Sequence, residues 1–167
     1  MRKPIIRSNV NPLALPTLFF AGRAVLTFRN TEKETHMTIK VKQATDKNDR
    51  KIKLPIFYLF VSLQGDGQTG YIFAATIFKD TNTIKLGRLV QEGTQLHKVV
   101  GFIWRALANP QMLKDKKVSL LHEGRCCRCS MPLTHPESIN TGFGPDCLEH
   151  ILAANKELNT DFFMKVE

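Results

Sequence analysis

Alternation of apolar and polar residues in the first half of the chain predicts β-strands. In the segments 23–29 and 36–43, apolar residues such as Leu26 and Ile39 alternate with polar or basic neighbours. Successive side chains of a strand point to opposite faces, so each segment has one apolar and one solvated face. The polar stretch 30–35 between them predicts a turn, and the two strands are expected to pair as a hairpin.

Two nearly continuous apolar runs follow, at 56–63 and 71–78, and they are typical of more deeply buried strands. The glycines of the segment 65–67 predict a turn between the two runs. Shorter strands are expected at 84–90 and 118–121. The sequence therefore predicts an α+β protein built on a small antiparallel β-sheet or partly open barrel of about five to six strands.

The apolar spacing changes from two to three or four residues after Thr94. The apolar positions at helical spacing are Leu96, Val99, Val100, Ile103 and Leu107. This period predicts one packing helix over 95–108, which begins after the cap Thr94 and ends before Pro110. A second helix is expected from Pro145 onward, where Gly144 and Pro145 form a typical helix start.

These patterns divide the chain into three parts. Residues 1–18 contain three prolines and little periodicity, and we expect an N-terminal arm. Residues 19–120 are expected to form a β-rich domain that includes the helix 95–108. Residues 121–167 contain all four cysteines and are expected to form a metal-binding module that ends in a C-terminal helix. With 167 residues, the chain is long enough to bury one core.

The positive charge is concentrated in the first third of the chain. The net charge is +9, and residues 1–53 hold 12 Lys and Arg against 4 Asp and Glu. Such an excess attracts polyanions through counterion release, so nucleic acid is the expected partner and an acidic protein surface is the alternative. The residues expected to contact phosphates are Arg23, Arg29, Lys40, Lys42, Lys47, Arg50, Lys51 and Lys53.

The cysteines are spaced for metal binding. Cys126 and Cys129 form a Cys-x-x-Cys pair, and Cys147 follows 18 residues later. The pair lets two thiolates hold one tetrahedral ion while the amides between them point at the sulfurs. Cys147 is expected in the first turn of a helix, where the dipole favours a thiolate. We therefore expect one structural zinc ion rather than a disulfide framework.

A closed zinc site needs a fourth ligand besides the three thiolates. His122 is the preferred candidate, because it lies four residues before Cys126 on the incoming strand. His150, Cys127 and His135 are the alternatives. Cys127 adjoins Cys126, and adjacent residues rarely bind one ion without strain.

The cysteine segment resembles an uncharacterised family, common in bacteriophages and actinobacteria, whose zinc-binding segment runs approximately H-x-G-x-C-x-x-C-G-R-x-L-T-x-P-x-S-x-x-x-G-x-G-P-x-C. The matching residues are His122, Gly124, Cys126, Cys129, Leu133, Thr134, Pro136, Ser138, Gly142, Gly144, Pro145 and Cys147. Ser130 and Met131 depart from the usual Gly-Arg, and Cys127 is an additional thiol. The resemblance implies a zinc site and a phage-type origin, without an activity.

The function indicated is binding rather than catalysis. The sequence contains no phosphate loop, dinucleotide fingerprint or nucleophile elbow, and no deaminase-type zinc motif. We expect a zinc-stabilised protein that binds nucleic acid largely without sequence preference, with Tyr58 and Phe143 as candidates for stacking on bases. The alternative is a phage-type accessory protein that binds a host or viral protein complex.

The apolar runs are far shorter than the roughly 20 residues that cross a bilayer. Polar residues and prolines interrupt the start of the chain, so neither a signal peptide nor a membrane span is expected. The expected location is the cytoplasm, which would be the host cytoplasm for a phage-encoded protein.

Overall fold

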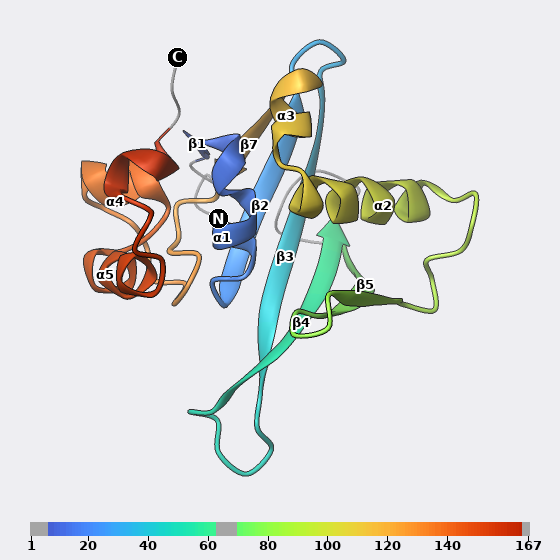
Figure 1. The fold of residues 1–167 in the computed structure, drawn as a ribbon. Helices are drawn as coiled ribbons and strands as arrows, with labels where there is room; N and C mark the ends of the chain where they lie inside the picture. The colour runs from blue at the N-terminus through green and yellow to red at the C-terminus, as the bar shows by residue number, and fades with distance from the viewer. Residues whose placement is uncertain (1–6, 63–69, 165–167) are drawn as a thin grey trace, which may run out of the picture.

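The computed structural model describes residues 7–62 and 70–164, which form an open antiparallel sheet with helices on one side (Figure 1). The strands, in chain order, are β1 (Ser8–Val10), β2 (Arg23–Asn30), β3 (Thr35–Thr45), β4 (Lys53–Ser62), β5 (Tyr71–Phe78), β6 (Thr83–Leu86) and β7 (Val118–His122). Their order across the sheet is β1-β7-β2-β3-β4-β5-β6. The predicted α+β class and antiparallel pairing are confirmed, while the described residues form seven strands rather than five to six, in an open sheet rather than a barrel.

The helices lie in two groups. The first consists of α1 (Leu15–Phe19), α2 (Gln95–Ala108) and α3 (Gln111–Asp115), preceded by a 3-10 turn η1 (Pro12–Ala14). The second consists of α4 (Pro136–Thr141), α5 (Pro145–Ala154) and a 3-10 turn η2 (Thr160–Phe163). In Figure 1 the first group lies across the sheet, and the second lies beyond its β1–β7 side. The structure therefore has several helices where the sequence predicted one packing helix and one C-terminal helix.

Helix α2 has the predicted bounds, and its start has the predicted chemistry. The Thr94 hydroxyl accepts a hydrogen bond from the His97 amide at 3.2 Å, which caps the first turn. Its buried side chains include Val100 and Ile103, and Phe102 packs edge-on against Phe28 of β2 with ring centroids 6.0 Å apart. This contact identifies the face of the sheet that α2 covers.

The start of the chain is more structured than the sequence predicted. Strand β1 pairs with β7, and the Leu15, Leu18 and Phe19 side chains around α1 are fully buried in the core. Neither feature is visible in the sequence. The three residues of β1 are too few to show a period, and the prolines of this segment lie in or beside short helical turns. Residues 1–6 of the expected arm, and the turn predicted at 65–67, lie outside the described residues.

The second face of the sheet carries the basic side chains. Directly paired residues of neighbouring strands point to the same face, and the strand alternation puts Leu26 on the α2 side. One row of paired residues on the opposite side runs Arg23, Lys42, Tyr58, Thr76 and Lys85 across five strands. The next row runs Val25, Lys40, Phe60 and Phe73. We call the surface formed by these two rows the outer face.

No helix within the described ranges is long and apolar enough to cross a membrane.

Candidate metal centre

Three cysteine sulfurs come together where the C-terminal module meets the sheet. The sulfurs of Cys126, Cys129 and Cys147 all lie within 4.8 Å of one another. The first two belong to a turn after β7, closed by a hydrogen bond from the Ser130 amide to the Cys126 carbonyl at 2.8 Å. Cys147 lies in the first turn of α5, as the sequence predicted. Ser130 has a φ of 69°, a left-handed conformation that favours the glycine it replaces in the related pattern.

The turn provides hydrogen bonds for a thiolate at Cys126. Burial alone would raise the pKa of this thiol. The backbone amides of Gly144, Cys129 and Arg128 donate to the sulfur and outweigh burial, so the pKa is below its ordinary value. Amides that point at a ligating sulfur are the arrangement expected for a Cys-x-x-Cys metal site.

Burial opposes the thiolate form of Cys147, which its position in the first turn of α5 favours. Burial raises its pKa to about 11, although Arg128 donates to the sulfur at 3.4 Å. Burial is the largest cause of this rise, and the negative charge of Cys126 adds to it, so the metal-free Cys147 thiol holds its proton more strongly than an ordinary cysteine. A metal ion would displace this proton, because the thiolate is the ligating form.

The three thiols could hold a metal ion. All four cysteines are free, so no disulfide competes for the sulfurs. Cys126 and Cys147 are buried, whereas Cys129 is exposed, which gives an ion a route from solvent. Soft thiolate ligands favour Zn²⁺, Cu⁺ or iron–sulfur chemistry over hard cations such as Mg²⁺.

His122, the preferred fourth ligand, lies outside this cluster. The Gly124 amide donates to its Nδ1 at 2.9 Å, and its Nε2 contacts the Ile139 carbonyl oxygen of α4. Because Nδ1 accepts a hydrogen bond, the ring proton lies on Nε2 and is donated to that carbonyl. Burial lowers the pKa of His122, so the ring is neutral and both nitrogens are used. In this arrangement the His122 side chain joins the end of β7 to Gly124 and to α4.

The other three candidates do not join the thiols either. Cys127 is completely buried, burial raises the pKa of its thiol, and its amide bonds the Gly142 carbonyl. His135 is the exposed N-cap residue of α4, and His150 is exposed on α5. Within residues 7–62 and 70–164, the side chains that group as possible metal ligands are therefore the three cysteines.

Replacing His122 by Ala is expected to destabilise the protein without reducing its capacity to bind a metal ion at the three cysteines. The substitution leaves the Gly124 amide and the Ile139 carbonyl without partners and opens a cavity, which costs about 3 kcal/mol of unfolding free energy. Chemical denaturation measures this cost, and elemental analysis of the folded variant measures the metal. The exposed His150→Ala is the matched control and should change neither. Metal loss in folded His122→Ala would show that the histidine is a ligand after all.

The cysteine turn packs directly against the start of β2. The Arg23 amide donates to the Cys127 carbonyl at 2.8 Å. Gly22 has a φ of 137°, and a Cβ at this position would lie 3.1 Å from the Arg128 carbonyl oxygen. Because a side chain at residue 22 would disturb this approach, the glycine permits close contact between module and sheet. The cysteine turn and the start of β2 are therefore in direct contact beside Arg23.

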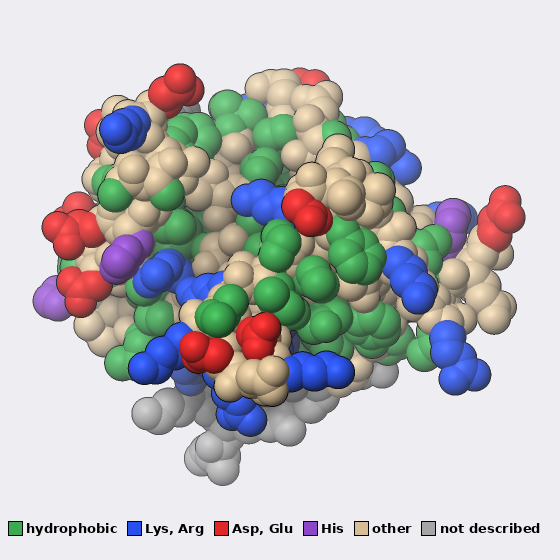
Figure 2. Space-filling view, turned by 60° about the horizontal axis from the view of Figure 1, so that its bottom comes forward, with side chains coloured by type: hydrophobic (Ala, Val, Ile, Leu, Met, Phe, Trp, Pro, Cys, Tyr) green, Lys and Arg blue, Asp and Glu red, His purple; other side chains and the backbone are tan. Residues whose placement is uncertain are grey.

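The eight basic residues predicted to bind nucleic acid are all exposed, and the structure groups half of them. Arg23, Lys42, Arg50 and Lys53 line one groove of about 640 Å³, together with Arg128 of the cysteine turn. We call this the basic groove. Figure 2 shows Lys and Arg side chains gathered around the β3–β4 hairpin, and a group of Asp and Glu side chains over the C-terminal helices.

The remaining four predicted residues lie outside the groove. Lys40 lies on the outer face, with its Nζ 4.5 Å from the centroid of the Tyr71 ring. Lys47 and Lys51 belong to the loop between β3 and β4, and Arg29 lies at the far end of β2 opposite His36. None of the eight forms an ion pair with a carboxylate of the described residues. The predicted residues thus form a groove and a flanking set.

Two aromatic residues also line the groove, and one of them, Tyr58, was predicted from the sequence to stack on bases. Tyr58 and Phe60 of β4 line its floor. Phe143, the other residue predicted to stack on bases, is fully buried against Phe163 with ring centroids 5.4 Å apart, so it belongs to the core. Arg128 also lines the groove. Its position there depends on the fold, which places the cysteine turn beside β2.

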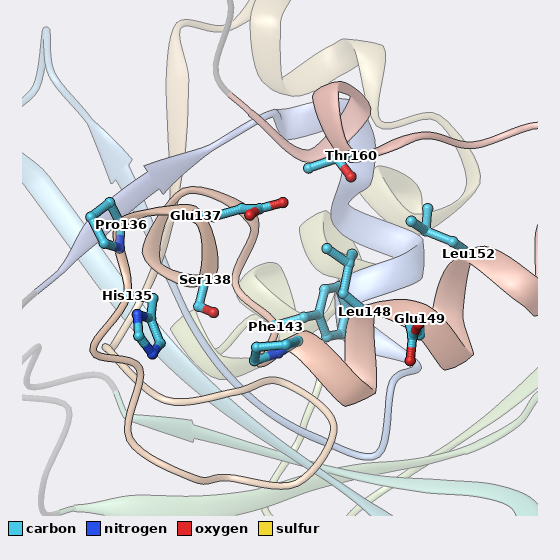
Figure 3. A pocket seen from close by; sticks show the side chains of 10 residues that line it. His135, Pro136, Glu137, Ser138, Phe143, Leu148, Glu149, Leu152 and Thr160 are labelled. Carbon is cyan, nitrogen blue, oxygen red and sulfur yellow. The ribbon is translucent and has the colours of Figure 1, made fainter.

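A second cavity, of about 600 Å³, lies between α4, α5 and η2 (Figure 3). Its lining includes His135, Glu137 and Ser138, residue types that occur in hydrolytic sites. No hydrogen bond joins these three side chains within the described part of the chain, and none of the clustered cysteines lines the cavity. The cavity therefore shows no nucleophile–base pair.

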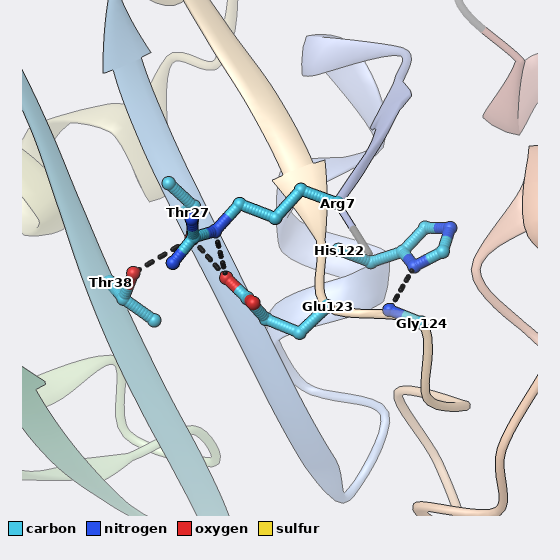
Figure 4. A network of polar contacts seen from close by, with 6 residues as sticks. All are labelled: Arg7, Thr27, Thr38, His122, Glu123 and Gly124. Atoms are coloured by element: carbon cyan, nitrogen blue, oxygen red, sulfur yellow. Dashed lines mark hydrogen bonds and ion pairs between the residues drawn. The ribbon is translucent and has the colours of Figure 1, made fainter. Parts of the chain in front are cut away.

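Arg7, Thr27, Thr38 and Glu123 form a network of polar contacts on the sheet, away from the basic groove (Figure 4). Arg7 donates to a Glu123 carboxylate oxygen at 2.8 Å, and the Thr27 hydroxyl donates to the same oxygen. Thr27 in turn shares a hydrogen bond of 2.8 Å with Thr38. Because the Glu123 side chain is only 6% exposed, this ion pair ties the segment before β1 to the sheet.

The fold and site together define an α+β protein with a three-cysteine cluster beside a basic sheet face. Residues 121–152 match the model of a family of unknown function (DUF6011), and this match covers the cysteine module without the sheet. No curated protein and no solved structure matches the chain.

Proposed function

We propose that the protein binds nucleic acid through its outer face, largely without sequence preference and without catalysis. The observation that carries the proposal is the basic groove, in which five cationic side chains surround Tyr58 and Phe60. Cations that make no ion pair within the described chain are available to neutralise phosphates, and each contact releases counterions. An aromatic floor adds a surface for bases of any identity.

We also propose that the metal is a single structural zinc ion. A trithiolate site with amides directed at a sulfur suits the tetrahedral, soft-ligand preference of Zn²⁺. Cys126, Cys129 and Cys147 would supply three of its four ligands, and the fourth position would be open to solvent beside the exposed Cys129. The ion would supply no chemistry to a substrate; it would fix the cysteine turn.

The metal site would support binding through its contact with the sheet. Arg128 lines the groove and bonds Cys147, while the adjacent Cys127 carbonyl holds the Arg23 amide. Two of the five groove cations therefore depend on the cysteine turn for their positions. The resemblance to phage sequences supports a phage-type protein that works in the cytoplasm of a host cell.

Salt dependence of binding tests this function. We expect labelled single strands of DNA and RNA to bind at low salt, with affinity that falls as salt rises. Five phosphate contacts correspond to a log–log slope of about −3.5 on single strands. Fluorescence anisotropy at several salt concentrations measures the slope. If no nucleic acid binds below about 100 μM at low salt, the weak limit of non-specific affinity, an acidic protein surface becomes the better partner for the groove.

A further inference from the structure

We infer that the ligand of the outer face is single-stranded nucleic acid, with its bases stacked on Tyr58, Phe60 and Phe73. This inference rests on the proposed function and specifies its substrate class. It requires three features on one surface: aromatic rings open to solvent, cations beside them, and a track long enough for several nucleotides.

The aromatic side chains of Tyr58 and Phe73 are partly exposed to solvent, although their burial would stabilise the fold. Tyr58 is 36% and Phe73 40% exposed, on adjacent central strands of the sheet. Phe60 pairs with Phe73 across β4 and β5, and their ring centroids are 5.6 Å apart. Tyr58 and Phe73 are 6.3 Å apart. The three rings thus form one continuous apolar patch, and exposed patches of this kind mark binding surfaces.

Lysine residues of β3 pair directly with the aromatic residues of β4. Lys42 is the direct neighbour of Tyr58 on the outer face, and Lys40 is the direct neighbour of Phe60. When a base stacks on one of these rings, the neighbouring lysine is close enough to bind the phosphate of the same or the next nucleotide. This interleaving of charge and aromatic surface favours a polyanion that carries planar groups over an acidic protein, which offers few such groups.

The track continues beyond the rings. On the β2 side of Tyr58 lies the basic groove, and on the β6 side of Phe73 lies a second hollow of about 350 Å³ lined by Lys85 and Arg88. The row from Arg23 to Lys85 crosses five strands, or about 19 Å at the usual strand spacing. Two basic regions joined by an aromatic centre form a path across the strands, as single-strand binding surfaces do.

Stacking distinguishes a single strand from a duplex. In a duplex the base faces are covered by their neighbours, so the rings have nothing to stack on, and only phosphates reach the protein. Both nucleic acids are expected to bind, since the cations serve both. Only the single strand gains from Tyr58, Phe60 and Phe73.

The test compares aromatic variants on three ligands at one low salt concentration. The ligands are a 12-nucleotide single strand, the same strand without bases, and its duplex. Tyr58→Ala combined with Phe73→Ala is expected to weaken single-strand binding about tenfold for each base that loses a ring. Duplex binding should change less than threefold. The wild type should bind the base-free strand at least as weakly as the variant, which keeps Phe60, binds the normal strand.

Conservative variants separate stacking from folding. Tyr58→Phe and Phe73→Tyr keep the rings and should retain wild-type affinity, and thermal unfolding of each protein confirms that the sheet is intact. Parallel strands of DNA and RNA show whether the sugar matters. If the alanine variant binds single strands as tightly as the wild type, the stacking inference is overturned while salt-dependent binding still supports the proposed function. If no ligand binds the wild type, both fail.

Discussion

Replacing Cys129 by Ser is expected to remove the bound metal and unfold the cysteine module. Cys129 is exposed, so serine opens no cavity in the core, and any loss of stability comes from the lost ligand. Structural zinc sites of this type contribute about 10–16 kcal/mol of apparent binding free energy to folding, and a missing thiolate removes part of this contribution. Phe143, Leu148 and Phe163 of the module belong to the same hydrophobic core as the strands, so the sheet is expected to lose stability as well.

Cys127→Ala is the matched control for this experiment. Cys127 lies two residues away, is fully buried and is not one of the clustered thiols, so this variant should lose packing but retain one metal per chain. Elemental analysis measures the metal, and hydrogen exchange over residues 122–154 measures the folding of the module. A metal-free Cys129→Ser protein that keeps wild-type protection in this region would contradict a structural role for the ion.

Neutralising the basic groove is expected to have the second largest effect, on binding rather than on folding. The variant replaces Arg23, Lys42, Arg50 and Lys53 by Gln, and each of these side chains is exposed. Each lost phosphate contact removes about 0.7 from the salt slope on single strands, so the slope should fall by about 3. At low salt the affinity should fall roughly a hundredfold.

A second fourfold variant controls for net charge. Lys33, Lys98, Lys114 and Lys156 are exposed and do not line the basic groove. Replacing them by Gln removes the same charge from elsewhere on the surface, and it should change affinity much less. Anisotropy titrations with labelled single strands measure the affinity of both variants. Equal losses would mean that total charge, rather than the groove, attracts the ligand.

The sequence predicted the elements whose signals are local. Helix α2 and strand β5 have the predicted bounds, and the hairpin of β2 and β3 differs from its prediction by a few residues. The helix start at Gly144 and Pro145 is also confirmed. These features follow from periodicity and capping, which depend on neighbouring residues alone.

Features that depend on distant contacts were missed. Strand β1 forms through its pairing with β7, and its three residues are too few to show alternation. His122 lies beside the cysteines in sequence, but its ring turns to the Ile139 carbonyl of α4, which no spacing rule reveals. Arg128 became a groove residue because Gly22 lets the cysteine turn approach β2. Each case is decided by packing between segments that are far apart along the chain.

Crosslinking tests most directly whether nucleic acid lies on the outer face. A 12-nucleotide single strand that carries a photoreactive 5-iodouracil would be irradiated with the metal-loaded protein, and the adducts located by peptide mass spectrometry. We predict adducts in β4 and β5, at Tyr58, Phe60 or Phe73, and their loss in the groove variant. Adducts confined to α2 or to the C-terminal helices, or none at all, would contradict binding at the outer face.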